Sequence, residues 1–405
     1  MQQATRRQVL GLLGVGSAAV GAFLDPSRFG VDASLSASVP PGRWPMAGRT
    51  PQRRGYQPTS DGPTTDPTVA WEQTVGSGYG FLVASEDTVY VSTDRVSAYA
   101  AEDGARRWSQ SLPANRTPEE VTLWRDRLYV CSTGPAECEI VDDCGREHKE
   151  LYALDAATGA IRWARSGISS VLSVAGATVI CGGDEGTIGL DAKTGGREWR
   201  RTCHSPTLVV EDTLACKRYD EGYREIIAGV DPHDGQEKWR HAARILGGAH
   251  RPRVVAATGR FIYGTTNDWV FKALDTATET LAWSVDLKFN NIAQVATDGE
   301  CVYLKDRDSL TNPGAVRLLA LDAETGDKQW EQTIEQAGHE GLVLTESALY
   351  VPVRGGVLVV DPDNGDDLGR SQPAGENLPR TVIAAGGQVY SFTNHEDEAT
   401  LYAHR

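Results

Sequence analysis

Short apolar runs alternate with polar turns along most of the chain. The runs are rich in β-branched and aromatic residues and each follows a short turn, which is typical of β-strands. The eight clearest are Val89–Val91, Leu128–Val130, Val179–Ile180, Leu214–Ala215, Phe261–Tyr263, Val302–Leu304, Leu349–Val351 and Val389–Ser391. After residue 70, no stretch of a dozen residues has the period of an amphipathic helix. The pattern therefore predicts an all-β protein.

A turn motif recurs between these strands. In its full form an apolar run ends at an Asp, a Gly stands four residues on and a Trp stands eight residues on. The full copies are Asp155, Gly159 and Trp163; Asp191, Gly195 and Trp199; Asp231, Gly235 and Trp239; and Asp322, Gly326 and Trp330. The partial copies are Ala100, Gly104 and Trp108; Asp275, Glu279 and Trp283; and Asp361 and Gly365. Successive copies lie 36 to 55 residues apart, a spacing that predicts the blades of a β-propeller.

The residue types of the motif suit a tight turn followed by packing. An Asp carboxylate accepts hydrogen bonds from backbone N–H groups two residues on, and a Gly adopts the positive φ that reverses the chain. The Trp then begins the outer strand, where its flat face can cover the neighbouring blade. A binding surface of aromatic rings is the alternative, but a binding site does not recur once in every repeat. We therefore interpret the three residue types as structural.

The strand count predicts eight blades closed into a ring. The eighth unit ends with Leu401–Ala403 and lacks its Trp-bearing strand, whereas a strand of that kind, residues 70–75 around Trp71, precedes the first unit. This N-terminal strand would complete the last blade and remove the exposed sheet edges. Residues 70–405 are therefore predicted to form an eight-bladed β-propeller of four-stranded antiparallel blades, with about 42 residues per blade.

Two segments resemble a known family. Residues 151–163, which read Leu-Tyr-Ala-Leu-Asp-Ala-Ala-Thr-Gly-Ala-Ile-Arg-Trp, resemble the pyrroloquinoline-quinone (PQQ) repeat of quinoprotein dehydrogenases and BamB-type assembly proteins. Residues 44–56, from Trp44 to Tyr56, resemble the lead-in of such propellers. Enzymes of the family carry an adjacent Cys-Cys pair, calcium-binding acids and a catalytic Asp. This chain has no adjacent cysteines and the repeat is only a scaffold turn, so we predict no cofactor.

The N-terminus carries an export signal. Residues 5–10, Thr-Arg-Arg-Gln-Val-Leu, form a twin-arginine pattern, and residues 1–24 end in an uncharged apolar stretch. That stretch is short for a transmembrane helix, although an uncleaved signal would still tether the protein to a membrane. Residues 25–69 are rich in Pro, Ser, Gly and Thr, which predicts a flexible linker. We expect a protein that is exported in the folded state and is extracellular or associated with the cell surface.

The net charge indicates the salt conditions in which the protein works and argues against nucleic acid as a partner. The chain has a formal charge of −15, and eight of its 40 basic residues are Lys. An acidic excess keeps a protein soluble at high salt, whereas nucleic acid attracts a basic face. The composition indicates a salt-adapted, GC-rich prokaryote, a halophilic archaeon. We expect a monomer that does not bind nucleic acid.

The seven cysteines fall into groups. Three of them directly follow strand runs, so we expect them to be buried small apolar groups. They are Cys131, Cys181 and Cys216. Cys138 and Cys144 lie in the one long insertion, roughly residues 133–150, where export favours a disulfide between them. Zinc bound by these two cysteines and His148 is an alternative with an unusual spacing, and a loop with neither bond is a third.

Catalytic and metal-binding signals are sparse. No G-x-S-x-G, H-E-x-x-H or phosphate-binding loop occurs. Residues 250–253, His-Arg-Pro-Arg, could bind an anion at a channel mouth, but solvated loop charge is the simpler interpretation. Residues 361–367 match a calcium loop only in part, because the Gly is one position early and the closing Glu is missing.

Two hypotheses about function, from different classes, follow from these observations. The first is a non-catalytic exported scaffold that binds another protein or an envelope component through the propeller face or rim. The second is a PQQ-dependent quinoprotein dehydrogenase, and a carbohydrate-binding or other enzymatic role on the propeller face is a further alternative. The scaffold is favoured because no segment displays the cofactor-binding groups of the enzymes.

Overall fold

The computed structural model describes most of the chain after residue 38. The described residues are 39–59, 62–134, 148–202, 205–210, 213–219, 225–242, 253–265, 270–278, 280–287, 295–307, 315–338, 341–371, 377–395 and 398–405. The predicted signal in residues 1–24, the predicted disulfide between Cys138 and Cys144, and residues 250–252 lie outside them. Within the described part, no helix is long and apolar enough to cross a membrane.

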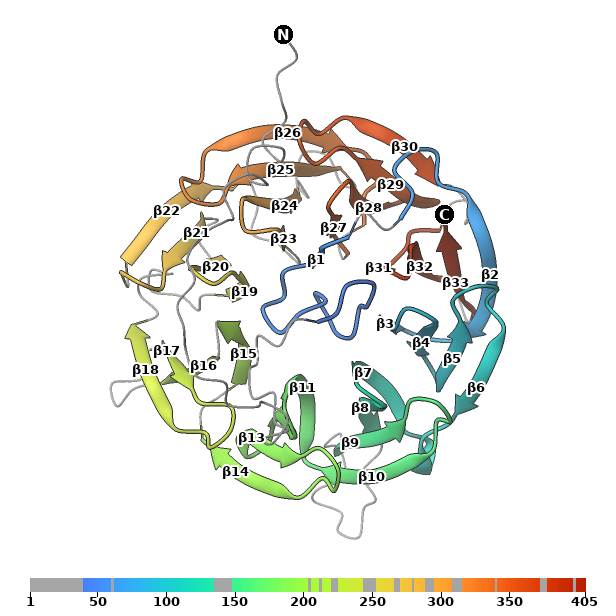
Figure 1. Cartoon of the computed structure of the whole chain (residues 1–405), viewed down its shortest axis with the longest axis vertical. Helices are drawn as coiled ribbons and strands as arrows, with labels where there is room; N and C mark the ends of the chain where they lie inside the picture. Colours follow the sequence, from blue (N-terminus) through green and yellow to red (C-terminus); the bar gives the residue numbers. More distant parts are fainter. Residues whose placement is uncertain are drawn as a thin grey trace, which may run out of the picture. The chain divides into compact units, whose positions relative to one another are not determined.

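The strands form eight sheets arranged in a ring (Figure 1). Within each blade, the strands are given below from the innermost to the outermost. Blade 1 contains β3 (Phe81–Ala84), β4 (Thr88–Ser92), β5 (Val96–Ala100) and β6 (Arg106–Gln110). Blade 2 contains β7 (Thr117–Trp124), β8 (Arg127–Gly134), β9 (His148–Asp155) and β10 (Ile161–Ser166). Blade 3 contains β11 (Ile168–Ala175), β12 (Thr178–Gly183), β13 (Gly186–Asp191) and β14 (Arg197–Arg201).

The remaining blades repeat this order. Blade 4 contains β15 (Ser205–Val210), β16 (Thr213–Tyr219), β17 (Glu225–Val230) and β18 (Glu237–Ala242). Blade 5 contains β19 (Arg253–Ala257), β20 (Phe261–Thr265), β21 (Val270–Asp275) and β22 (Thr280–Asp286). Blade 6 contains β23 (Val295–Thr297), β24 (Cys301–Arg307), β25 (Val316–Asp322) and β26 (Lys328–Ile334). Blade 7 contains β27 (Val343–Thr345), β28 (Leu349–Val353), β29 (Gly356–Val360) and β30 (Asp367–Ser371). Blade 8 contains β31 (Thr381–Ala385), β32 (Gln388–His395), β33 (Glu398–His404) and β2 (Val69–Gly76).

Blade 8 is completed by the strand that precedes blade 1 in the sequence. β2 pairs antiparallel with β33, and Trp71 lies opposite Ala403. The Trp71 side chain is buried, and its Nε1 donates a hydrogen bond to the carbonyl of Ala101 in blade 1 at 2.9 Å. The prediction of an all-β, eight-bladed propeller closed by an N-terminal strand is therefore confirmed.

The Asp-Gly-Trp motif joins each blade to the next. Asp155 illustrates the turn, since its Oδ1 accepts hydrogen bonds from the N–H groups of Ala157 and Thr158, both at 3.1 Å. Where the turn has a Gly, that Gly lies against the Trp of the preceding blade, and in five of these turns the Trp donates from Nε1 to the carbonyl of the residue after the Asp. The donor–acceptor pairs are Trp108 with Ala156, Trp163 with Ala192, Trp199 with Pro232, Trp283 with Ala323 and Trp330 with Pro362. Turn geometry and packing therefore occupy these residues.

The replacement Gly195→Ala is expected to destabilise the propeller by about 1–3 kcal/mol. Gly195 has a φ of +72°, and a Cβ there would lie 2.7 Å from Cε3 of Trp163. The neighbouring replacement Gly196→Ala is the control, because Gly196 does not have a positive φ and its Cβ would meet only Oγ1 of Thr194, at 3.3 Å. Urea unfolding of both variants measures the difference, and equal losses would contradict this explanation.

The core lies between neighbouring blades. Apolar side chains of blades 1 and 2, such as Val83, Leu128 and Leu154, form one buried cluster, and blades 5 and 6 share another. The three cysteines that follow strand runs belong to this interior. The side chains of Cys131, Cys181 and Cys216 are 1 %, 0 % and 0 % exposed. The prediction that they are buried small apolar groups is confirmed.

Residues 39–59, which we call the central segment, lie inside the ring (Figure 1, blue). The segment exchanges backbone hydrogen bonds with the inner strand, or the residue after it, in most blades. The pairs are Gly42 with Gly386 in blade 8, Trp44 with Ala84 in blade 1, Pro45 with Leu123 in blade 2, Pro51 with Val209 in blade 4, Gln52 with Ala257 in blade 5, Arg54 with Thr297 in blade 6 and Gly55 with Leu344 in blade 7. Its short strand β1 (Tyr56–Gln57) runs parallel to β27.

A buried arginine holds the central segment together. Arg49 is 3 % exposed, and its guanidinium donates hydrogen bonds of 3.0–3.2 Å to backbone carbonyls of the same segment. The acceptors are Val39, Pro40, Arg43 and Tyr56. Burial lowers the pKa of Arg49 to about 10. Because this charge has carbonyl partners in place of water, the segment has a polar core of its own.

The central segment falls within residues 25–69, for which composition predicts a flexible linker. The structure differs there, because Trp44, Arg49 and Gln57 are 3 %, 3 % and 0 % exposed. Glycine in this stretch serves tight turns, as at Gly48 and Gly55, which have φ of +67° and +59°. A composition rich in Pro and Gly describes such a series of turns as well as it describes a flexible chain.

Candidate functional site

A contact between serine and histidine lies between blades 7 and 8. The two ring nitrogens of His404, Nδ1 and Nε2, lie 2.7 Å from the hydroxyl oxygens of Ser371 and Ser391. His404 is completely buried, and this burial lowers its pKa to about 4. No substrate can reach these groups, so the contact is structural.

Acid is expected to destabilise the protein partly through His404. An unfolded histidine takes up a proton near pH 6.5, whereas the folded one stays neutral down to about pH 4. Stability from this group is therefore complete above pH 6.5 and falls toward pH 4 by on the order of 3 kcal/mol. Urea unfolding between pH 7 and pH 4.5 should show a shallower loss in His404→Gln than in the native protein. Replacement of the exposed His233 by Gln is the control, and an unchanged slope in His404→Gln would contradict the assignment.

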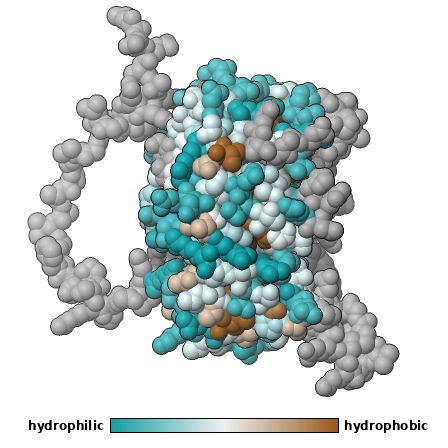
Figure 2. All heavy atoms as spheres, turned by 90° about the vertical axis from the view of Figure 1, so that its right-hand side faces the viewer, coloured by the Kyte–Doolittle hydropathy of each residue, from teal (hydrophilic) through white to brown (hydrophobic). Residues whose placement is uncertain are grey.

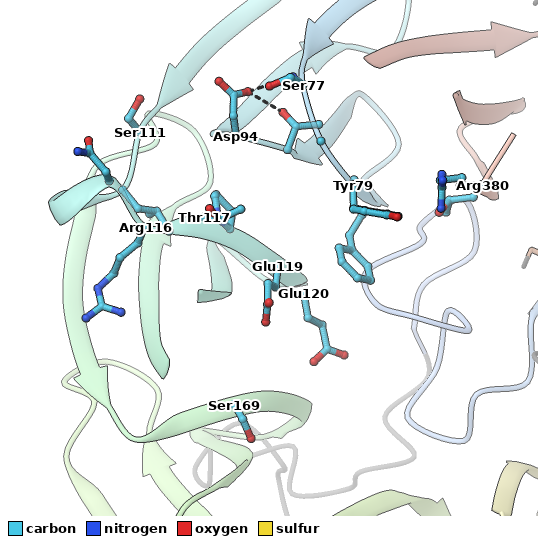
Figure 3. A pocket seen from close by; sticks show the side chains of 18 residues that line it. Ser77, Tyr79, Asp94, Ser111, Arg116, Thr117, Glu119, Glu120, Ser169 and Arg380 are labelled. Atoms are coloured by element: carbon cyan, nitrogen blue, oxygen red, sulfur yellow. Dashed lines mark hydrogen bonds between the residues drawn. The ribbon is translucent and has the colours of Figure 1, made fainter. Parts of the chain in front are cut away.

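A pocket of about 930 Å³ opens where the chain enters the inner strands of blades 8, 1 and 2 (Figure 3). The loop before β3, the loop before β7 with its 3₁₀ turn η4 (Pro113–Asn115), and the start of β31 contribute most of the lining. β11 of blade 3 adds one residue. The lining comprises Ser77–Phe81, Thr93–Asp94, Ser111–Leu112, Asn115–Glu120, Ser169 and Arg380–Thr381.

One wall of the pocket is aromatic. The side chains of Tyr79 and Phe81 are 69 % and 42 % exposed, which is unusual for residues of this size in a soluble domain. The guanidinium of Arg380 lies 4.4 Å from the centre of the Tyr79 ring, a cation–π contact. Gly80, between the two rings, packs closely against Phe392, since a Cβ on Gly80 would lie 2.4 Å from Cζ of Phe392.

The opposite wall carries two consecutive glutamates. A β-bulge between Pro118 and Val121 interrupts the pairing of β7 with β8, and Figure 3 shows both Glu119 and Glu120 directed into the pocket. A regular strand would send successive side chains to opposite faces of the sheet, so the bulge is what brings the two carboxylates together. Glu119 accepts a hydrogen bond from the Thr133 hydroxyl at 3.1 Å. Burial raises the pKa of Glu120, and this effect is opposed by the charge of Arg53 in the central segment.

Two other charged groups of the lining have partners of opposite charge. Nε of Arg116 lies 3.0 Å from Oε2 of Glu150, which also accepts a hydrogen bond from the hydroxyl of Tyr152. Asp94 pairs with Arg95, with 2.7 Å between Nη2 and Oδ2. The pocket therefore presents two carboxylates on one wall and exposed aromatic rings with the exposed Arg380 on the other, and the remaining side chains of the lining are mainly neutral.

The pocket contains none of the site residues that the sequence predicts. Residues 250–252, Cys138 and Cys144 lie outside the described part, His148 and Arg253 begin β9 and β19, and the Asp, Gly and Trp residues belong to the blade turns and to the outer strands. Two signals do mark the pocket, namely the glycine–aromatic run Gly78–Phe81 and the pair Glu119 and Glu120. Neither recurs in other blades, so the repeat pattern does not reveal them.

The fold and its repeat define an eight-bladed propeller of the PQQ-repeat class. The family model described as outer membrane protein assembly factor BamB matches residues 64–146, 95–216 and 223–402. The chain belongs to this family. A comparison with curated proteins found no match.

Solved structures share the fold at low sequence identity. BamB from Moraxella catarrhalis is 17 % identical with a TM-score of 0.57, and the match covers 83 % of this chain and 97 % of that one. Quinohemoprotein alcohol dehydrogenase from Comamonas testosteroni is 15 % identical with a TM-score of 0.64, covering 91 % and 81 %. The computationally designed Ika8 protein is 11 % identical with a TM-score of 0.61, covering 84 % and 99 %. Such likeness shows the fold alone.

The dehydrogenases of this fold imply PQQ and a metal ion, and the described residues of this pocket do not fit either group. Within the described ranges, no group of three or more His, Cys, Asp or Glu side chains could hold a metal. PQQ is a tricarboxylic acid, and Glu119 and Glu120 would repel it electrostatically in this pocket. We therefore derive no chemistry through these groups.

Proposed function

We propose that this protein is a non-catalytic, exported scaffold that binds another protein or an envelope component through the pocket face of the propeller. The carrying observation is the pocket itself, which presents exposed aromatic rings and two carboxylates beside a ring axis that the central segment occupies. The Asp, Gly and Trp residues of the repeat are committed to turns and blade packing. The assembly-factor description of the family supports the same function.

The outer side of the ring is a poorer candidate for a protein-binding surface than the pocket face. In Figure 2, the side that carries β2 and β6 is mostly hydrophilic, with small and separate hydrophobic patches. Protein-binding surfaces of the hydrophobic kind are larger and continuous. The exposed aromatic residues Tyr79 and Phe81 lie instead at the pocket.

Site-specific photo-crosslinking tests the scaffold proposal. A photoreactive phenylalanine analogue at Tyr79 should give one defined crosslinked product in the native host, and the purified partner should form the same product in vitro. The analogue at Leu281, which is 43 % exposed on the outer strand of blade 5, is the matched control and should give none. Equal products at both positions, or none at Tyr79, would refute binding at the pocket face.

A PQQ-dependent dehydrogenase is the second candidate, and the fold shared with quinohemoprotein alcohol dehydrogenase favours it. Incubation of the purified protein with PQQ and calcium distinguishes the scaffold from the dehydrogenase. The scaffold proposal expects no quinone absorbance after desalting and no dye reduction with alcohols or aldose sugars. Stoichiometric retention of the quinone would contradict the scaffold proposal and support a PQQ-dependent dehydrogenase.

Export by the twin-arginine route is part of the proposal. The double variant Arg6→Lys/Arg7→Lys is expected to remain inside the cell, because the pathway recognises the arginine pair itself. Replacement of Arg28 by Lys, outside the pattern, is the control. Quantitative immunoblotting of cell and medium fractions measures the distribution, and unchanged secretion of the double variant would contradict the route.

A further inference from the structure

We propose that the pocket binds the positively charged side chain of a lysine or arginine in a partner polypeptide. This inference rests on the scaffold function and specifies the chemistry of its binding site. It follows from the two carboxylates of the pocket, from the aromatic rings beside them and from the size of the cavity.

Neither Glu119 nor Glu120 forms a direct ion pair with another of the described residues. Glu119 accepts a hydrogen bond from the neutral hydroxyl of Thr133, and the charge of the exposed Arg53 acts on Glu120 without such a contact. A partly buried carboxylate with no counter-ion in direct contact is unfavourable, because burial removes part of its hydration. An ammonium or guanidinium group in the pocket would supply that direct contact and form charge-assisted hydrogen bonds.

The aromatic wall favours the same kind of ligand. Tyr79 and Phe81 expose ring surface to the pocket, and the faces of such rings attract organic cations. The guanidinium of Arg380 already uses the Tyr79 ring in this way. Arg380 itself is exposed to solvent, where water and salt screen its charge, so it opposes a second cation only weakly.

The size and surroundings of the pocket favour a polypeptide over a small free cation. A cavity of about 930 Å³ is at the upper end of the range for sites that enclose drug-sized molecules, and a single ammonium group would fill a small part of it. Ser111, Asn115 and Thr117 line the remainder and can bond to peptide groups next to the charged side chain. The net charge of −15 also attracts a basic partner over distance.

Short peptides that differ in one charge test the inference. The probes are acetyl-Gly-Arg-Gly-amide, its Lys analogue and a peptide with citrulline, the uncharged isostere of arginine. Titrations followed by saturation-transfer NMR at low salt should show that the arginine and lysine peptides bind about tenfold more tightly than the citrulline peptide. The double variant Glu119→Gln/Glu120→Gln should lose this preference.

A variant of equal net charge is the control. Glu72→Gln/Glu102→Gln removes two exposed carboxylates outside the pocket and should retain the preference, while thermal unfolding verifies that both double variants are folded. Equal binding of the arginine and citrulline peptides, or a preference that survives in Glu119→Gln/Glu120→Gln, would overturn the inference. Tighter binding of tetramethylammonium than of any peptide would also overturn it, in favour of a small cation. Crosslinking at Tyr79 that persists while the peptide preference is absent would leave the scaffold function standing and refute this inference alone.

Discussion

Deletion of residues 70–76 is expected to abolish the cooperative unfolding of the whole propeller. These residues form nearly all of β2, the outer strand of blade 8, and their removal leaves β33 with an unpaired edge and blade 1 without the packing of Trp71. An open edge invites pairing with other chains, so aggregation should accompany the loss. Scanning calorimetry and size-exclusion chromatography measure both effects.

Two single replacements separate closure of the ring from packing of one tryptophan. Trp71 and Trp108 make the same contact in successive blades, with ring centres 5.9 Å from Tyr390 and 6.0 Å from Tyr90. Trp71→Ala and Trp108→Ala should therefore lose similar amounts, about 3 kcal/mol each, and still unfold cooperatively. A deletion variant that is monomeric and no less stable than Trp71→Ala would show that the N-terminal strand does not close the ring.

Replacement of Arg49 by Ala is expected to release the central segment and to lower the free energy of unfolding by about 3 kcal/mol or more. The variant would leave the four carbonyls that Arg49 binds without a donor inside the ring. Arg49→Lys should recover little, because an ammonium group cannot reproduce the planar arrangement of guanidinium donors. Trypsin should then cleave within residues 39–59 faster than in the native protein.

Arg53→Lys is the matched control for this experiment. Arg53 lies in the same segment but is exposed, and Lys retains the charge that acts on Glu120, so this replacement should change stability by no more than about 0.5 kcal/mol. Equal stability losses in Arg49→Lys and Arg53→Lys would contradict the role given to the buried guanidinium.

The blades could be predicted from the sequence because their determinants are local and repeated. A turn such as Asp155–Trp163 contains its own hydrogen-bond acceptor, its residue of positive φ and its packing group, so it can be recognised without any knowledge of distant contacts. Eight copies of one strand pattern also fix the number of blades. Closure followed from the same count, since one strand was missing at the C-terminus and one was in excess near Trp71.

The pocket could not be predicted in this way. Its groups come from separate loops, and each occurs once, so no period distinguishes Tyr79 or Glu120 from ordinary surface residues. The bulge that turns Glu119 and Glu120 to the same side depends on pairing with β8 and leaves no mark in the residue pattern. The residue pattern does not predict the ordered structure of the central segment for a related reason, because backbone groups make most of its contacts.

The central segment also has a consequence for how many blades the ring can contain. From Gly42 to Gly55, its backbone contacts run through blades 8, 1, 2, 4, 5, 6 and 7, which is their order around the circle. A ring with one blade fewer or more would displace these inner strands from their partners in the central segment. The segment therefore fits a ring of eight blades and no other number. Its contacts also join residues far apart in the sequence, such as Gly55 and Leu344. Residues 42–55 thus match the size of the ring that β2, the first strand after the central segment, closes.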